Sequence, residues 1–237
     1  MNKDNNEYQE ISKVGLLDLS CPVTYTKEAG LSWNPQGPRD LISERARVSV
    51  PPEIAKGKSG ALMDYLADHK HWSPFEMVTA GFLIETPRDI SRQILRHRSL
   101  HFQEFSQRYA DPLKDVGVLW NLRQVRGQDT ENRQNSLEDV SYHVQRNSEE
   151  AMSHALRASV AEYEYLINQG VAKEVARVVL PEGLTMSRMF VSGTIRSWIH
   201  YCYVRCDMST QKEHREVAEK VRSILWDILG LDIDEED

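Results

Sequence analysis

RHRSLHFQEFSQRY, residues 96–109, is the densest polar stretch of the chain, with three arginines, two histidines and one glutamate. Burying so many polar groups without partners is costly, so the stretch is a candidate binding site. Just before it, Arg92, Gln93, Arg96 and His97 recur at three- and four-residue spacing, which gives one helix face cationic and amide groups. Such a face suits an anion. The alternative is structural, because arginines at a helix C-terminus also complement the helix dipole.

The segments upstream of this stretch predict alternating helices and strands. Thr86 as N-cap and Pro87 at the first helical position indicate a helix from Pro87 to about Arg98. Alternating bulky residues predict a strand over Phe75–Glu85. Further elements are expected as a strand over Val14–Leu19, a helix over Asp40–Arg47 and a second helix capped by Ser59.

The segments downstream are expected to be mostly helical. A strand over Val116–Val125 and a polar loop over Arg126–Ser136 come first. Helices are then expected from Ser148 to Gly170, over Lys173–Val179, over Arg188–Arg205, and from a capping box at Thr210 and Glu213 to Gly230. The fold class is therefore predicted as α+β, helix-rich, with a small antiparallel sheet.

Composition sets the broad class. With 237 residues and no break in composition, one domain over 1–237 is expected, with the polar first ten residues and the acidic tail 232–237 peripheral. A net charge of −7 argues against a protein that wraps nucleic acid. The three cysteines are too few for a disulfide framework, and a signal peptide or membrane span is not evident, so a cytoplasmic protein is expected.

Other signals are weaker than residues 96–109. Gly57-Lys58-Ser59 lacks the glycine that a phosphate-binding loop has five residues earlier, so a loop followed by a helix cap is favoured. The histidine pairs at 69/71 and 97/101 could hold a metal, yet the sequence has no His-Glu-x-x-His, so no metal site is expected. Trp198, Tyr201 and Tyr203 are interpreted as core or subunit contacts at helical spacing.

Residues 96–109 resemble the signature of flavin-dependent thymidylate synthases, which is Arg-His-Arg, seven residues, then Ser. That core is intact here as Arg96-His97-Arg98 and Ser106, and Glu104 and Arg108 add further matches. Two positions depart from the extended pattern, with His101 in place of Ser and Gln103 in place of Asn. The resemblance extends to residues 46–49, 71–76, 174–181 and 196–205, so it covers most of the chain.

The resemblance implies a site for two nucleotides. For catalysis it implies Arg205, Ser106 and His71. Around dUMP it implies Gln93, Arg96, Glu104, Ser106, Gln107, Arg108, Arg177 and Arg205. Around FAD it implies Ser49, Ser73, Glu76, Arg96, His97, Arg98, Glu104, Arg196, His200 and, as a weaker match, Thr194.

The implied reaction is methylation of dUMP to dTMP, with 5,10-methylene-tetrahydrofolate as carbon donor and FAD reduced by NADPH. No cysteine is well placed as a nucleophile, so the guanidinium of Arg205 would stabilise charge on the pyrimidine instead. The family's homotetramers share pockets between subunits, and Arg196 and Arg205 lie on opposite sides of one helix, so that helix would serve two sites. Two alternatives stay open: a non-catalytic module that binds nucleotide or single-stranded nucleic acid, and a metal-dependent phosphohydrolase.

Overall fold

The computed structural model describes residues 11–20, 23–26, 30–33, 37–51, 59–118, 120 and 122–231. Its centre is a four-stranded antiparallel sheet in the order β1-β4-β8-β5. These strands are β1 (Lys13–Leu19), β4 (Thr79–Pro87), β8 (Met186–Thr194) and β5 (His101–Glu104). The predicted α+β class, helix-rich with a small antiparallel sheet, is confirmed.

One face of the sheet is buried under helices. Along β8, Met189 and Val191 are buried while Phe190 between them is half exposed, as the two-residue period of a strand requires. Phe82 of β4 pairs with Val191 and is fully buried. The sheet therefore has a core face and an outer face.

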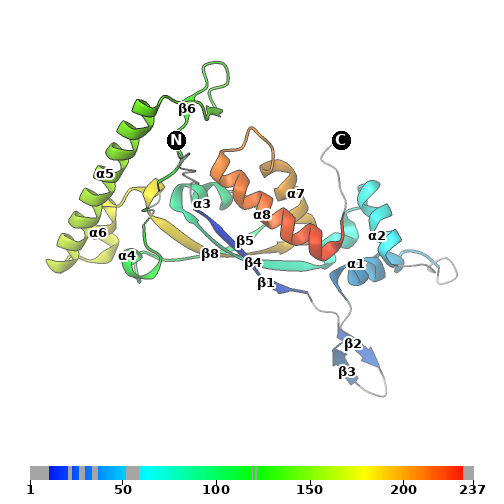
Figure 1. Cartoon of the computed structure of the whole chain (residues 1–237). Coiled ribbons are helices and arrows are strands. Elements are labelled where there is room, and N and C mark those ends of the chain that lie inside the picture. Colours follow the sequence, from blue (N-terminus) through cyan, green and yellow to red (C-terminus); the bar gives the residue numbers. More distant parts are fainter. Residues whose placement is uncertain are drawn as a thin grey trace, which may run out of the picture.

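Helices α3 (Arg88–Ile94), α7 (Ile195–Arg205) and α8 (Lys212–Leu229) cover the core face (Figure 1). Trp198 of α7 is fully buried, lies 4.8 Å from the ring of Phe82, and donates from Nε1 to the carbonyl of Ala80 at 3.0 Å. The apolar stripe of α8, including Val217, Val221 and Leu225, is fully buried against the same core.

Two shorter helices, α1 (Pro38–Arg47) and α2 (Ser59–Asp68), pack at one end of the molecule. Arg39 of α1 ties this end to the last turn of α8, because its Nη1 donates to the carbonyls of Leu229 and Gly230 at 2.9 and 2.6 Å. Gly230 adopts a left-handed φ of 56° and ends α8, as predicted.

The long helix α5 (Tyr142–Asn168) extends along the opposite end with α6 (Lys173–Ala176) (Figure 1). A separate small core of Tyr163, Ala176 and Leu180 holds this part together. The remaining elements are β2 (Val23–Thr26) paired with β3 (Gly30–Trp33), η1 (Ser73–Met77), α4 (Pro112–Asp115), β6 (Gly127–Gln128) paired with β7 (Ser136–Leu137), η2 (Arg177–Val179) and η3 (Glu182–Leu184).

Several predicted boundaries were wrong. The helix expected over Pro87–Arg98 is α3, which begins one residue later and ends at Ile94, because Pro87 still belongs to β4. The strand expected from Phe75 begins only at Thr79, after the 3-10 turn of η1. The helix expected from Ser148 begins at Tyr142, where the Ser141 side chain caps it.

Two predicted elements have the wrong type. The stretch Arg188–Arg205, expected as one helix, divides at Thr194 into β8 and α7. The described residues of Val116–Val125 form no strand, and only an isolated bridge joins Val118 to Thr185. The loop expected over Arg126–Ser136 contains the short β6–β7 pair.

The capping box at Thr210 and Glu213 is also wrong. The hydroxyl of Thr210 donates to the carbonyl of Val204, and the carboxylate of Glu213 contacts Arg126 and Gln211. The peripheral segments expected at residues 1–10 and 232–237 lie outside the described residues.

Candidate functional site

Arg205, the last residue of α7, meets His97 in the turn that follows α3. The Nε of Arg205 donates to Nε2 of His97 at 2.9 Å. An arginine N–H can only donate, so Nε2 of His97 carries no proton and its Nδ1 holds the proton of the neutral ring. Two residues expected at different ligands, Arg205 at dUMP and His97 at FAD, are therefore in direct contact.

A second histidine, His214 of α8, packs beside this pair. Its ring lies 6.3 Å from that of His97, and the ring of Tyr201 lies 4.9 Å from His97 and 5.8 Å from His214. Burial, aided by the nearby charge of Arg205, lowers the pKa of His97 to about 4 and that of His214 to about 3. Both rings are therefore neutral at pH 7, next to the permanent cation of Arg205.

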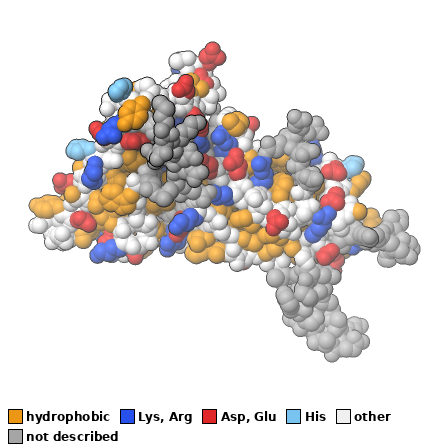
Figure 2. Space-filling view, viewed as in Figure 1, with side chains coloured by type: hydrophobic (Ala, Val, Ile, Leu, Met, Phe, Trp, Pro, Cys, Tyr) orange, Lys and Arg blue, Asp and Glu red, His pale blue; other side chains and the backbone are white. Residues whose placement is uncertain are grey.

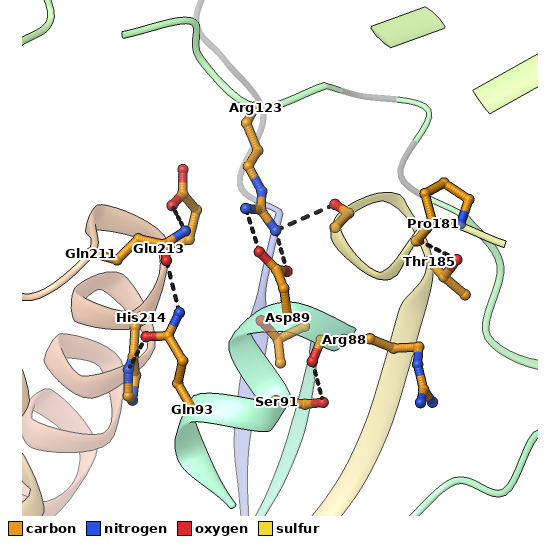
Figure 3. A network of polar contacts seen from close by, with 12 residues as sticks. Arg88, Asp89, Ser91, Gln93, Arg123, Pro181, Thr185, Gln211, Glu213 and His214 are labelled. Atoms are coloured by element: carbon orange, nitrogen blue, oxygen red, sulfur yellow. Dashed lines mark hydrogen bonds and ion pairs between the residues drawn. The ribbon is translucent and has the colours of Figure 1, made fainter. Parts of the chain in front are cut away.

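A chain of hydrogen bonds links His214 to α3 and to the loop before β6. Arg126 donates to Glu213 at 2.7 Å, Gln211 donates to Glu213 at 2.9 Å, and Gln93 donates to Gln211 at 2.7 Å. The Oε1 of Gln93 then lies 3.2 Å from Nδ1 of His214. Figure 3 shows Gln93 on α3 pointing toward Gln211 and His214 at the start of α8.

Asp89, one turn before Gln93, anchors the start of α3. Both of its carboxylate oxygens accept from Arg123, which also donates to the carbonyl of Gly183 at 3.3 Å (Figure 3). Two polar attachments one turn apart therefore hold α3 and fix the position of Gln93.

Glu104 on β5 forms a second cluster beneath α3. It pairs with Met189 across the sheet and so lies on the core face. Its Oε1 accepts from the hydroxyls of Ser91 and Ser187 at 2.9 and 2.8 Å, and Arg92 lies 3.6 Å from its Oε2. The signature glutamate is thereby fixed in place, and its second oxygen faces a half-exposed cation.

Glu76 forms a third cluster at the start of α7. The hydroxyl of Thr194 donates to one carboxylate oxygen at 2.7 Å, and Arg196 donates to the other at 2.8 Å. The Thr194 hydrogen bond, followed by Arg196, lowers the pKa of Glu76. Thr194 also caps α7 by accepting from the Ser197 amide at 3.1 Å. The structure thus brings together three residues predicted to bind FAD.

The end of the signature contacts the α5–α6 end of the molecule. Arg108 donates to Glu174 at 3.1 Å, and the hydroxyl of Ser106 accepts from the Arg108 amide at 3.4 Å. Gln107 is buried, and its Nε2 has no hydrogen-bond partner among the described residues. Arg177 is half-buried in η2, on the same side of the molecule as Glu174.

The other predicted site residues lie at the surface. Arg96 and Arg98 are exposed in the turn before β5, and His200 is exposed on α7. Ser49, His71 and Ser73 are exposed near the ends of α1, α2 and η1. Within this chain they do not contact the clusters at Arg205 or Glu104 through any hydrogen bond that the structure describes.

The two positions that depart from the family pattern face away from these clusters. His101 pairs with Ser192 and Gln103 pairs with Phe190, so both lie on the outer face of the sheet. They line a shallow hollow of about 250 Å³ together with Phe190, Asp18 and Leu17. In Figure 2, hydrophobic side chains lie along the lower edge of the molecule, below the sheet, with charged side chains between them.

Sequence reasoning missed several partners of the site, chiefly His214, Gln211, Arg126, Ser91 and Ser187. Most of them lie far along the chain from the residues they contact, since Gln93 lies 118 positions from Gln211 and 121 from His214, whereas Ser91 lies 13 positions from Glu104. One local signal existed, because Gln211, Glu213 and His214 place three polar groups at the start of an amphipathic helix.

Within the described residues, no three His, Cys, Asp or Glu side chains are grouped as a metal site would require. None of the helices in that part of the chain is long and apolar enough to cross a membrane.

The comparisons with known proteins agree on one family. The model of the family described as thymidylate synthase complementing protein matches residues 31–229. A flavin-dependent thymidylate synthase of Synechocystis is 41% identical over 207 residues, which cover 85% of this chain and 91% of that protein. A probable flavin-dependent thymidylate synthase of Paramecium bursaria Chlorella virus 1 is 40% identical, covering 78% of this chain and 84% of that protein.

The fold matches a solved structure over nearly its whole length. A UMP/dUMP methylase, PolB from Streptomyces cacaoi bound with 5-Br UMP, aligns with a TM-score of 0.72 at 24% identity and covers 93% of this chain and 91% of its own. At that identity the likeness is one of fold. On the family match and the two relatives, the chain belongs to the flavin-dependent thymidylate synthase family, a family of enzymes.

Proposed function

We propose that the protein methylates dUMP to dTMP, using 5,10-methylene-tetrahydrofolate as carbon donor and FAD reduced by NADPH. The observation that carries this proposal is the contact of Arg205 with the neutral His97, a residue of the family signature. The names of the relatives and the nucleotide in the PolB structure support a pyrimidine nucleotide as substrate. A homotetramer with shared sites and a cytoplasmic location belong to the same proposal.

Arg205 is suited to polarise the pyrimidine. Carbon 5 of uracil must become nucleophilic before it can accept a one-carbon unit, and this requires negative charge at N3 or the adjacent carbonyl oxygens. A guanidinium fixed by His97 through Nε keeps four N–H groups on its terminal nitrogens for those atoms. Because the cation is positioned before the reaction begins, it stabilises the developing charge without reorganisation.

The other dUMP residues supply acceptors and cations for a nucleotide monophosphate. We assign Gln93, Arg96, Glu104, Ser106, Gln107, Arg108 and Arg177 to dUMP, with Ser106, His71 and Arg205 nearest the reaction. The buried Nε2 of Gln107 has no partner in the part of the chain that the structure describes, which supports this assignment because a buried amide needs an acceptor. The arginines of this set are suited to bind the phosphate group of dUMP through charged hydrogen bonds.

The described residues also fit FAD. Its pyrophosphate needs cations, which the exposed Arg96 and Arg98 offer. Its polar groups could form hydrogen bonds with the cluster around Glu76. When bound, FAD would mediate transfer of the folate's methylene carbon and supply the hydride that completes the methyl group. The residues that would hold it are Ser49, Ser73, Glu76, Arg96, His97, Arg98, Glu104, Thr194, Arg196 and His200.

The cysteines within the described residues support a reaction without a cysteine nucleophile. Cys202 is buried in the core, and burial raises the pKa of its thiol well above the usual value. Cys206 is half-buried at the end of α7, and the side chain of Cys202 lowers its pKa, so it is the cysteine to test. We expect Cys206→Ser to form dTMP at a rate close to that of the wild type.

The decisive experiment incubates the purified protein with dUMP, 5,10-methylene-tetrahydrofolate, FAD and NADPH, and measures dTMP by mass. We expect dTMP only when FAD is present, and we expect the Cys206→Ser and Cys21→Ser variants to behave in the same way. Folded protein that binds FAD but forms no dTMP would contradict the proposed reaction. Loss of dTMP in either cysteine variant would contradict the absence of a cysteine nucleophile.

A further inference from the structure

In the chain of hydrogen bonds that joins Arg126 to His214 through Glu213, each group can play only one role at each contact, donor or acceptor. Arg126 can only donate and the ionised carboxylate of Glu213 can only accept, and their side chains are 12% and 4% exposed. Hydrogen bonds from Gln211 and Arg126 offset the burial of Glu213 and lower its pKa, which keeps it ionised. The amide of Gln211 must therefore turn its Nε2 to Glu213 and its Oε1 to Gln93.

The orientation of the Gln93 amide is fixed in the same way. Its Nε2 donates to Oε1 of Gln211, so its Oε1 faces His214 and accepts from Nδ1–H. A flipped Gln93 amide would set two acceptors against each other at Gln211 and, unless the His214 ring changed its tautomer, two donors against each other at His214. His214 is fully buried and neutral, so water cannot replace this contact.

The fixed amide keeps one N–H of Gln93 for a ligand. An amide nitrogen has two hydrogens, and Gln211 takes one of them. Gln93 is half-buried on α3, the helix that also carries exposed Arg92 and leads into exposed Arg96. Arg92 is paired with Glu104 and Glu182, so a ligand approaching this face meets the cation of Arg96 and the N–H donor of Gln93, which suits an anionic oxygen.

We propose that His214 is a positioning residue that fixes the Gln93 amide, so that Gln93 presents an N–H donor to an oxygen of the bound nucleotide. This inference rests on the proposed function, in which Gln93 binds dUMP. His214 itself touches no ligand, and the ion pair of Arg126 with Glu213 sets the direction of the whole chain of hydrogen bonds.

The test compares two substitutions of nearly equal size. His214→Asn places an amide N–H close to the position of Nδ1, whereas His214→Leu fills similar space without a donor. Dissociation constants for dUMP are measured by calorimetry on the flavin-loaded protein, with kcat and the KM for dUMP alongside. We expect His214→Leu to raise Kd and KM about 10-fold with kcat changed less, which corresponds to about one lost hydrogen bond. His214→Asn should stay within about 3-fold of the wild type.

A double-mutant cycle then tests whether His214 acts through Gln93. On a Gln93→Ala background, His214→Leu should add less than about 2-fold to the Kd for dUMP, because the amide it positions is gone. If His214→Leu does not fold, Gln211→Met serves in its place, since it releases the other side of the Gln93 amide and should weaken dUMP binding similarly.

The outcomes separate this inference from the proposed function. Wild-type protein that fails to bind dUMP would overturn both. Wild-type protein that binds dUMP, with His214→Leu and His214→Asn indistinguishable, would overturn the role of His214 alone. The same conclusion would follow if His214→Leu cost as much affinity on the Gln93→Ala background as in the wild type.

Discussion

At the scale of single residues, the site depends on a cation held by a neutral histidine. Arg205 contacts His97 through Nε, so its terminal nitrogens remain for a planar partner. A lysine has one nitrogen and cannot both contact His97 and bind a pyrimidine edge at two points. We therefore expect Arg205→Lys to lower kcat/KM for dUMP at least about 10-fold while thermal unfolding stays close to the wild type.

The matched control for this prediction is Arg146→Lys on α5, where the arginine is exposed and pairs with Glu150 one turn away. Such a surface pair contributes little, so the control should leave turnover unchanged. Steady-state kinetics with varied dUMP measure both variants. Equal activity of the two would mean that the geometry of Arg205 is not needed for the reaction.

The buried histidines predict how stability depends on pH. The pKa of His214 is about 3 in the folded protein and near 6.5 when unfolded, so acid protonates the unfolded chain first. Stability is therefore full above about pH 6.5 and falls as the pH decreases toward 3. Between pH 7 and 5 we expect a loss of about 2 kcal/mol from His214 alone, or a Tm lower by about 4–8 °C.

Calorimetry across this pH range tests the assignment, with His214→Asn as the comparison because asparagine does not titrate. The decrease in Tm from pH 7 to pH 5 should be smaller in His214→Asn than in the wild type. Parallel curves for the two proteins would show that His214 is not the group responsible.

At the scale of elements, Thr194 joins the sheet, α7 and the Glu76 cluster. Its hydroxyl accepts from the Ser197 amide and donates to Glu76. Thr194→Val keeps the shape but removes both hydrogen bonds, so we expect it to destabilise the protein by about 1–2 kcal/mol and to weaken FAD binding. Thr194→Ser keeps the hydroxyl and should restore both. Urea unfolding and flavin titration give the two readouts, and equal stability of the Val and Ser variants would contradict the role of the cap.

Local signals predicted the presence of most elements, but not all of their bounds and types, because contacts with distant parts of the chain also decide these. The strand predicted at residues 14–19 is β1, and the end of α8 at Gly230 follows from a glycine C-cap. The β8–α7 boundary was missed because no proline separates the two elements, although Thr194 is a typical N-cap. At the site, the resemblance supplied Arg205 and His97, whereas their contact joins residues 108 positions apart and local patterns do not encode it.

At the scale of the whole molecule, the two arginines of α7 belong to different clusters. Arg196 contacts Glu76 at the first turn, and Arg205 contacts His97 at the last. Nine residues of helix separate them by about 13 Å along the axis and place them on opposite sides. If a site contains the Arg196 cluster of one subunit and Arg205 of another subunit, each α7 takes part in two sites of a homotetramer.

Mixed tetramers test this arrangement. We expect Arg196→Ala and Arg205→Ala to be nearly inactive alone, and their co-expressed mixture to regain about a quarter of wild-type activity. In random assembly, about a quarter of the sites between subunits contain an intact Arg196 from one chain and an intact Arg205 from the other. Sedimentation should give about four times the 27.3 kDa chain mass for each sample. Two differently tagged Arg205→Ala chains serve as the control and should stay inactive when mixed. If the Arg196→Ala and Arg205→Ala mixture also stays inactive although it assembles, each site takes both arginines from the same chain, and α7 serves a single site.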